Sequence, residues 1–465
     1  MIKFKPIIFY VVFFLFVLAF GTITNNYDCD LWARLIAGMG FIQSGHVLKQ
    51  DFLSYTPTHQ WFDHEWGSGV IFYLIHHFFS SAGLMVLQAV LIFLTFFFIS
   101  KIVKLRGCKS TTAYNFLFYY FTFISFSYII YAPVRCQMFS FLFFTVFLYI
   151  LELARVGKFK PMWLLPIIMI VWNNLHGGCV AGIGLIFLYV IGEFLNKKPV
   201  KPYVIALVLS VIVLPINPWG FAYLGFLFKA VSMQRPLITE WDNIFSDMVD
   251  CSKFKIYALV FMFTELIFVI KQFALKTFKI DYTKLLVILA TLAGAILHVK
   301  FIPFAVITMA SFLYDDFYNL FNSLTKNWFN KIADVKDFLI YSLILLFAFS
   351  TLKLRGFGPY LDWSRYPVRA VEFLKINNIE GNLLTDFTWG SYISYKLYPN
   401  NKIYMDGRYE EVYNDDMLPM YDDFYNGRKG WDKVLVKFPT DIILIEKTSP
   451  VCFFLNKDVR WKIIF

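Results

Sequence analysis

The sequence predicts a polytopic α-helical membrane protein of about eleven transmembrane helices, followed by a small C-terminal α/β domain. Of its 465 residues, 58% are apolar and only 16% are charged, whereas soluble proteins are about 25% charged. Aromatic residues reach 21%, with 56 Phe, which is more apolar surface than one soluble core can bury. This composition excludes a disordered chain, a coiled coil, collagen and an ordinary cytosolic enzyme. The six cysteines form no Cys-x-x-Cys pair, so neither a disulfide framework nor a zinc ribbon is indicated.

The first candidate span is the apolar run 6–24, which follows Lys3 and Lys5. A signal peptide is the alternative. We favour an uncleaved helix, because the run is long enough to cross a bilayer and no clean small-x-small cleavage site follows it. Ten later apolar runs complete a transmembrane domain at residues 1–352, and they fall at 84–100, 112–131, 136–154, 161–175, 177–194, 202–216, 255–270, 285–299, 301–314 and 338–352.

The distribution of Lys and Arg orients these spans. With the N-terminus in the cytoplasm, the inner segments hold nineteen Lys and Arg, and the outer loops before residue 353 hold seven, as the positive-inside rule requires. In this orientation the apolar run 67–80 is a helix that lies on the outer surface of the membrane rather than a span. It places the first outer loop, 25–82, and the soluble domain, 353–465, outside the cytoplasm. The net charge of +11 then reflects cytoplasmic loops and not a nucleic-acid partner.

The first outer loop carries two carboxylates directly after the first span. An amphipathic helix is predicted from Leu31 to Gln43, ended by Ser44-Gly45. Asp28 and Asp30 precede it, and in an extended segment residues two apart point the same way. Both carboxylates could then face one site, near a helix N-terminus that favours negative charge. The alternative is that they only cap the helix.

A second acidic cluster in this loop consists of Asp63, His64 and Glu65, flanked by Trp61 and Trp66. It is not a zinc-protease motif, because a serine stands where the second histidine would be. Carboxylates serve as general bases or metal ligands, and Trp rings stack on sugars or anchor in the membrane interface. The tripeptide is compatible both with a solvated turn and with a functional site.

Polar residues also stand at the predicted outer ends of several spans. Ionisable groups at membrane depth are costly and often line a polar cavity, where cations suit a phosphate. Interfacial snorkelling is the alternative, above all for Lys300 and Lys253. The candidates for substrate binding are Arg135, Asn174, His176, Glu240 and His298.

The C-terminal segment alternates helix and strand patterns, which predicts a mostly parallel sheet in an α/β domain. Asp406-Gly407-Arg408 follows a predicted strand end, where such folds place functional loops; a turn with an ion pair is the alternative. The predicted helices are 366–377, 389–397, 414–425 and 431–437, and the predicted strands are 382–386, 402–405 and 441–446.

The sequence contains a set of motifs along its length: Asp28-x-Asp30-Leu31-Trp32, Asp51-Phe52-x-Ser54-Tyr55-Thr56, Trp61, His64-Glu65-Trp66, Trp172-x-Asn174-x-His176-Gly177-Gly178 and Asp406-Gly407-Arg408. Together they resemble a large family of bacterial polytopic membrane proteins related to the C-type (GT-C) glycosyltransferases, which include oligosaccharyltransferases, protein mannosyltransferases and lipid A aminoarabinose transferases. The resemblance covers nearly the whole chain, with Cys29 where the family often has proline and Arg34 where it often has histidine.

The resemblance implies a glycosyltransferase of the bacterial inner membrane that acts on its outer face. The donor would be a polyprenyl-phosphate or polyprenyl-diphosphate sugar, and the acceptor a glycan, a lipid or a protein. Asp28 or Asp30 would act as the catalytic base or orient the acceptor, and Asp63 or Glu65 would assist. Metal dependence stays open, with Asp28, Asp30 and Glu65 as candidate ligands of a divalent cation. The leaving phosphate would be stabilised by Arg135, His176 and His298, and the other substrate-binding candidates are His64, Trp61, Trp66, Asn174 and Glu240.

Two non-enzymatic alternatives remain at this stage. A flippase or transporter for the same lipids would carry functional charges near mid-bilayer and internal repeats, and the sequence has neither feature. An envelope assembly protein would act through its soluble C-terminal domain, and the acidic residues of the first loop would be dispensable.

Overall fold

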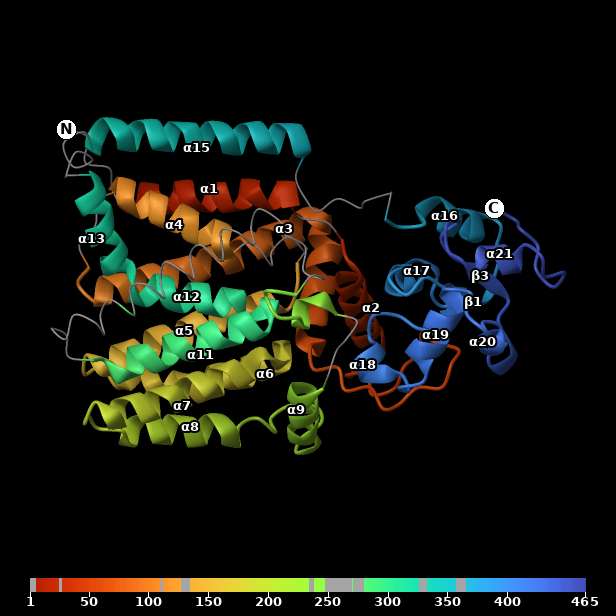
Figure 1. The fold of residues 1–465 in the computed structure, drawn as a ribbon, viewed down its shortest axis with the longest axis horizontal. Coiled ribbons are helices and arrows are strands. Elements are labelled where there is room, and N and C mark those ends of the chain that lie inside the picture. Colours follow the sequence, from red (N-terminus) through yellow and green to blue (C-terminus); the bar gives the residue numbers. More distant parts are fainter. Residues whose placement is uncertain are drawn as a thin grey trace. The chain divides into compact units, whose positions relative to one another are not determined.

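The computed structural model is mostly helical (Figure 1). It describes residues 6–24, 27–108, 112–126, 134–233, 238–246, 270, 280–325, 333–356 and 365–465.

Contacts divide the chain into two compact units. The helical unit holds residues 1–25 and 81–359, and the composite unit holds residues 26–80 and 360–465. The division expected from the sequence, between residues 352 and 353, differs from this one because it assigns the first outer loop to the transmembrane domain. In the structure that loop packs with the C-terminal domain instead.

Long apolar helices lie alongside one another in the helical unit (Figure 1). Aromatic side chains fill the space between them: the Phe13 ring lies 5.3 Å from Phe96, and the Phe16 ring lies 5.3 Å from Phe123. The helices, with short 3-10 turns marked η, are α1 (Pro6–Thr24), the second part of α3 (Trp66–Leu105), α4 (Thr112–Phe126), α5 (Gln137–Arg155), η1 (Lys160–Trp163), α6 (Leu164–Leu175), η2 (Gly177–Cys179), α7 (Val180–Leu195), α8 (Lys201–Ile212), α9 (Ala222–Ser232), η3 (Thr239–Trp241), α11 (Tyr282–Leu297), η4 (Val299–Phe301), α12 (Ile302–Phe312), α13 (Tyr314–Thr325) and α15 (Ala333–Arg355).

A helix covers most of the described part of ten of the eleven predicted spans, and the run 255–270 lies outside the described residues except for Ile270. Within the described residues, three helices are long and apolar enough to cross a membrane: Trp66–Leu105, Gln137–Arg155 and Gly177–Leu195. Six further apolar helices are shorter, at 10–17 residues. The predicted helical character is therefore confirmed, and three described helices are long and apolar enough to cross a membrane, but the count of about eleven spans is not confirmed.

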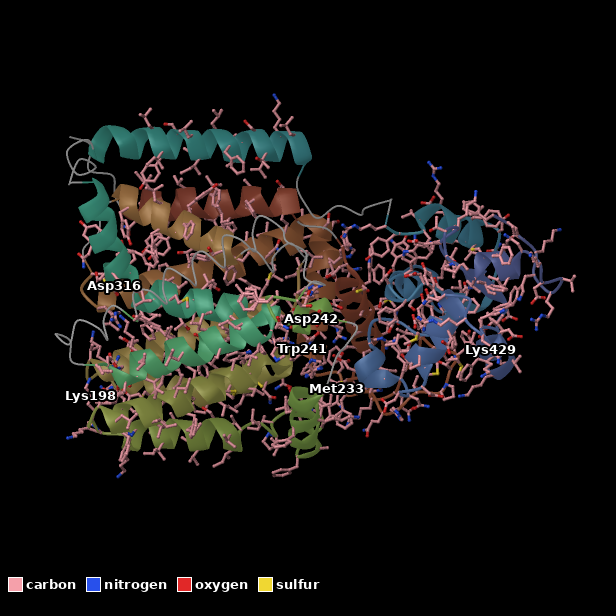
Figure 2. The ribbon with its side chains drawn as sticks, in the orientation of Figure 1. Lys198, Met233, Trp241, Asp242, Asp316 and Lys429 are labelled. Carbon is pink, nitrogen blue, oxygen red and sulfur yellow. The ribbon has the colours of Figure 1, made fainter. Side chains whose placement is uncertain are left out.

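The connections of the helical unit lie at its two ends. Lys198 and Asp316 are at one end of the bundle, and Trp241 and Asp242 are at the other (Figure 2). The predicted topology requires this separation, because it puts Lys198 in a cytoplasmic loop and Trp241 in an outer one. Which end faces the cytoplasm stays a prediction from the charge bias.

An ion-pair network ties three helices together at the Lys198 end. Arg155 at the end of α5 lies 3.3 Å from Glu152, 2.8 Å from Glu193 on α7 and 2.8 Å from Asp281 before α11. Thr283 also donates to Glu193 at 2.7 Å. Because both glutamates are buried, Arg155 compensates charge that would otherwise be costly.

Helix α3 consists of two helices that meet at Ser80, whose backbone is not helical (φ 55°, ψ −156°). The break falls at the end of the run 67–80, which the sequence predicts to be separate from the following span. The position of 67–80 on a membrane surface stays a prediction.

The C-terminal part of the composite unit is a small α/β layer. Its parallel sheet has the strand order β2-β1-β3, with Leu383 of β1 opposite both Ile403 and Ile442. All seven elements predicted here are confirmed, and two short helices, α18 and α21, were not predicted. The elements are α16 (Val368–Ile376), β1 (Gly381–Thr385), α17 (Gly390–Leu397), β2 (Asn401–Ile403), α18 (Tyr409–Val412), α19 (Met417–Tyr425), α20 (Lys433–Lys437), β3 (Ile442–Leu444) and α21 (Cys452–Leu455).

The first outer loop extends this sheet beyond β2. Ser54 forms a parallel bridge with Ile403, Tyr55 N donates to Ile403 O at 3.1 Å, and Ile403 N donates to Leu53 O at 2.9 Å. Thr58 then forms an antiparallel bridge with Tyr413. The edge of β2 is thereby paired, which protects backbone groups that an open edge would expose.

The first outer loop also contains helix α2 (Cys29–Ser44). It ends as predicted at Gly45, whose φ of 73° is the left-handed conformation that terminates many helices. Gly38 lies directly against the backbone of Gly69 and the side chain of Tyr73, so α2 and the first part of α3 are in close contact.

Candidate functional site

The start of α2 brings the first acidic pair beside the C-terminal part. Asp28 caps the helix, because its Oδ1 accepts from Leu31 N at 2.8 Å; a catalytic role for this residue stays a prediction. Asp30 is half-buried in the first turn. The prediction that both carboxylates share one extended segment is wrong, because the helix already begins at Cys29.

The Asp406-Gly407-Arg408 loop lies against this helix start. A Cβ added to Gly407 would sit 3.9 Å from Cys29 Cβ and Sγ. Tyr366, just before α16, donates from its hydroxyl to Tyr27 O at 3.3 Å. Burial raises the pKa of Tyr366, and the nearby negative groups of the α2 start raise it further. Two motifs far apart in the sequence therefore meet.

One turn after Asp30, the buried Arg34 gathers three carboxylates. Its Nη1 pairs with Asp63 Oδ1, its Nε lies 3.5 Å from Glu65 Oε2, and its Nη2 lies 3.7 Å from Glu411 Oε2. Asp30 and Arg34 are four residues apart on α2 and therefore share one helix face. The second acidic cluster is thus held next to the face that carries Asp30.

His64 joins this cluster through both ring nitrogens. Its Nδ1 lies 2.9 Å from Glu411 Oε1, and its Nε2 lies 3.7 Å from Glu65 Oε1. Burial acts to lower the pKa of His64, but the carboxylates of Glu411 and Glu65 outweigh it and raise the pKa to about 9. Burial acts to raise the pKa of Glu411, but His64 and Arg34 outweigh it and lower the pKa to about 2. The pair is therefore ionised at neutral pH.

Asp63 and Glu65 have different surroundings. The Asp63 side chain is only 4% exposed, and its Oδ1 also accepts from Glu65 N at 3.1 Å. Burial raises the pKa of Asp63, Arg34 opposes this shift, and the crowding of Glu411 and Glu65 adds to it. The Glu65 side chain is 16% exposed. Asp63 anchors Arg34, whereas Glu65 is the more accessible of the two predicted carboxylates.

A second buried ion cluster lies behind Trp61. Arg408 pairs with Asp51 at 2.7 Å and with Asp406 at 3.0 Å, and each of these side chains is at most 1% exposed. Asp51 also accepts from Ser54 N at 2.8 Å. Burial acts to raise the pKa of Asp51, but the charge of Arg408 and the hydrogen bonds from Ser54 outweigh it, so the pKa is lowered. The ion pair expected for Asp406-Gly407-Arg408 under the alternative is therefore present, and a functional role of this loop stays a prediction.

Trp61 connects the two ion clusters. Its Nε1 donates to Glu411 Oε2 at 2.9 Å, and Arg408 lies over its ring at 4.7 Å from the centroid. The residue is fully buried. The Trp66 ring packs 5.5 Å from Phe41. Both predicted stacking residues are thus engaged in contacts within the protein, and their role in sugar binding stays a prediction.

The helical unit brings together three of its predicted substrate-binding residues. Arg135, before α5, pairs with Glu240 at 2.5 Å. In the next residue, Trp241, the carbonyl oxygen lies 2.6 Å from His298 Nδ1, and Lys300 Nζ lies 3.0 Å from the ring centroid. Arg135, His298 and Lys300 thus lie around one short segment, η3. Arg135 precedes α5 in the chain, and His298 and Lys300 precede α12.

His176 caps the turn that begins α7. Its Nδ1 accepts from Gly178 N at 3.0 Å and lies 2.6 Å from Ser140 Oγ, which in turn accepts from Trp172 Nε1 at 2.7 Å. Because Nδ1 accepts from a backbone N–H, the neutral imidazole carries its proton on Nε2. Asn174 donates to Ile216 O at 2.9 Å, a contact that holds the loop after α8.

Within the described part of the chain, no group of three or more His, Cys, Asp or Glu could hold a metal ion. The predicted cation ligands Asp28, Asp30 and Glu65 are not gathered as such a group there, and metal dependence stays open.

Sequence reasoning missed Glu411, named Asp51 only as part of a motif without a role, and treated Arg34 only as a departure from the family pattern. Glu411 follows the Asp406-Gly407-Arg408 motif closely, which is the one signal that could have pointed to it. Its contact with His64 spans almost the whole chain, and nothing local encodes such a pairing.

Comparison of the chain with models of known protein families and with curated proteins gives no match.

Proposed function

We propose that the protein is a membrane glycosyltransferase that transfers a sugar from a polyprenyl-phosphate-linked donor to an acceptor on the outer face of the membrane. The observation that carries this proposal is the meeting of Asp30 with two other motifs. Asp30 lies half-buried in the first turn of α2, beside the Gly407 loop and one turn from Arg34 and its carboxylates. A polar, acidic site in a chain that also carries long apolar helices suits a substrate with a lipid tail and a hydrophilic head.

The roles of the acidic residues divide according to their contacts. Asp28 uses one oxygen to cap α2, and Asp63 is buried against Arg34. Asp30 is then the carboxylate best placed to deprotonate or orient the acceptor hydroxyl, since a general base must be reachable by substrate. Glu65, next in accessibility, would assist it.

The helical unit supplies groups suited to the leaving phosphate. Arg135, His298 and Lys300 lie close to Trp241, and His176 can present Nε2–H as a donor. Cations and N–H donors at helix starts favour phosphate, and preorganised donors stabilise charge that grows on a leaving group.

The direct test is turnover by the purified full chain in proteoliposomes, supplied with a panel of polyprenyl-phosphate and polyprenyl-diphosphate sugars and with an extract of cell-envelope acceptors. We expect release of free polyprenyl phosphate or diphosphate from one donor class, dependent on acceptor. The panel is chosen by comparing the lipid-linked sugars of cells with and without the protein.

The same vesicles separate the rival functions. Movement of a lipid-linked sugar between leaflets without any release of the carrier would replace the proposal with a flippase. Neither turnover nor movement, together with an intact cellular role when the first-loop carboxylates are neutralised, would favour an assembly protein.

A further inference from the structure

We propose that Glu411, in the C-terminal part, is a positioning residue for the first-loop site, because it holds His64 against Glu65. The inference rests on the proposed function where it concerns catalysis, and it adds a residue that sequence analysis did not assign. The site would then require both parts of the composite unit, residues 26–80 and 360–465.

Each carboxylate oxygen of Glu411 contacts a different side chain of the first loop. Oε1 lies 2.9 Å from His64 Nδ1, and Oε2 accepts from Trp61 Nε1 at 2.9 Å. Trp61 is itself fixed by burial and by Arg408 over its ring. Because both oxygens of Glu411 have an attractive neighbour, its carboxylate has little rotational freedom, and its negative charge holds the His64 ring beside it.

The other nitrogen of the His64 ring lies near Glu65. With Nδ1 2.9 Å from Glu411 Oε1, Nε2 lies 3.7 Å from Glu65 Oε1, and Arg34 Nε lies 3.5 Å from Oε2. Each oxygen of Glu65 therefore lies near a cationic side chain, at a distance longer than a short ion pair. Such contacts limit the rotamers of Glu65.

The charges that face His64 come from three segments. Glu411 belongs to α18, Glu65 and Asp63 to the loop before α3, and Arg34 to α2. Two cations stand among three carboxylates. Removal of the Glu411 charge would leave the His64 ring close to the positive charge of Arg34. The ring would also lose the carboxylate that lies nearest to it.

The first experiment measures the contact itself and does not depend on activity. Spectra of histidine-labelled full chain in nanodiscs are recorded by nuclear magnetic resonance at one neutral pH, and His64 is assigned among the seven histidines from a His64→Gln spectrum. Because Glu411 Oε1 lies 2.9 Å from His64 Nδ1, we expect Glu411→Gln to shift the His64 ring-nitrogen resonances far more than those of the other histidines. Unchanged His64 resonances would overturn the proposal.

The second experiment is a double-mutant cycle on transfer rate. Glu411→Gln is expected to lower kcat about 10–100-fold with little change in the KM for donor, as a small misplacement of a reacting group does. In a Glu65→Gln background the same change should cost nothing further, because Glu411 acts through His64 on Glu65. An equal loss in both backgrounds would show a structural role alone and overturn the positioning role.

A matched control comes from an exposed carboxylate of the same unit. Asp422 pairs with Arg428 at the surface, where its side chain is 46% exposed, so Asp422→Asn should change neither the His64 resonances nor kcat. Glu411→Asp, which keeps the charge, should bring the His64 resonances part of the way back to their wild-type positions. A wild type that turns over no lipid-linked sugar would refute the proposed function, and the His64 resonances would still decide the contact.

Discussion

Replacing Arg408 with methionine should destabilise the composite unit as a whole. Arg408 is the cation between Asp51 of the first loop and Asp406 of the C-terminal part, and their side chains are 1% and 0% exposed. Methionine retains much of the length and apolar volume of the side chain but removes the charge and every donor. Two buried carboxylates are then left without their cation, and Trp61 loses the guanidinium over its ring.

The size of the stability loss can be estimated from the burial of the three side chains. Removing one partner of a buried ion pair typically costs about 3–5 kcal/mol, because the remaining charge is left in a poorly solvated place. For a unit of about 160 residues, each kcal/mol shifts the midpoint of thermal unfolding by roughly 2–4 °C. We therefore expect the unfolding midpoint of Arg408→Met to fall by roughly 6–20 °C.

Hydrogen exchange of the full chain in nanodiscs, followed by mass spectrometry over a temperature series, measures this change by segment. The segments 53–59 and 381–403 should lose protection together, because the loop strand is bonded to β2. Arg428→Met is the matched control, since this pair is exposed and such pairs contribute about 0–1 kcal/mol. The reasoning would be refuted if Arg408→Met behaved like the control, or if only the C-terminal segment lost protection.

Three further predictions concern pH, helix packing and orientation. Glu411 is the main cause of the raised pKa of His64, so the charged pair contributes its full stabilisation below about pH 6.5 and loses it as pH rises through about 9. The free energies of unfolding in urea of wild type and Glu411→Gln should therefore converge above pH 9. Gly192→Ala should lower the unfolding midpoint, because an added Cβ meets Thr283, and overpacking costs about 1–3 kcal/mol. On the same helix, Gly184→Ala has open space and should raise the midpoint slightly. A cysteine introduced in the segment 196–201 should react with an impermeant thiol reagent only after cells are permeabilised; labelling in intact cells would invert the predicted topology.

Local patterns predicted the C-terminal α/β elements and the limits of α2 well. Strand and helix periodicities there are regular, and Gly45 supplies a conformation that ends a helix at one residue. The apolar runs likewise coincide with helices over most of their described length. Their lengths differ from the expected spans because hydropathy marks a region, whereas turns such as His176–Gly178 and the break at Ser80 fix where a helix begins and ends.

The candidate site was predictable only in part, because its contacts are long-range. Asp63, His64 and Glu65 were identified as a cluster from their spacing. The partner that orients His64, Glu411, lies in another part of the chain, and so does Arg408, the partner of Asp51. The extended interpretation of Asp28 and Asp30 failed because a helix start at Cys29 changes the direction of Asp30, and periodicity locates such boundaries poorly.

The most direct test of the proposed glycosyltransferase compares Asp30→Asn with Asp28→Asn in the proteoliposome transfer assay, at equal protein abundance. Asparagine caps helices about as well as aspartate, so Asp28→Asn should retain its fold and most of its rate. Asp30→Asn removes the proton acceptor, and loss of a general base typically lowers the rate roughly 10²–10⁴-fold. We expect Asp30→Asn to be abundant, folded and inactive. Full activity in Asp30→Asn would contradict the assignment of Asp30 as the catalytic carboxylate and, with it, the observation on which the proposed function depends.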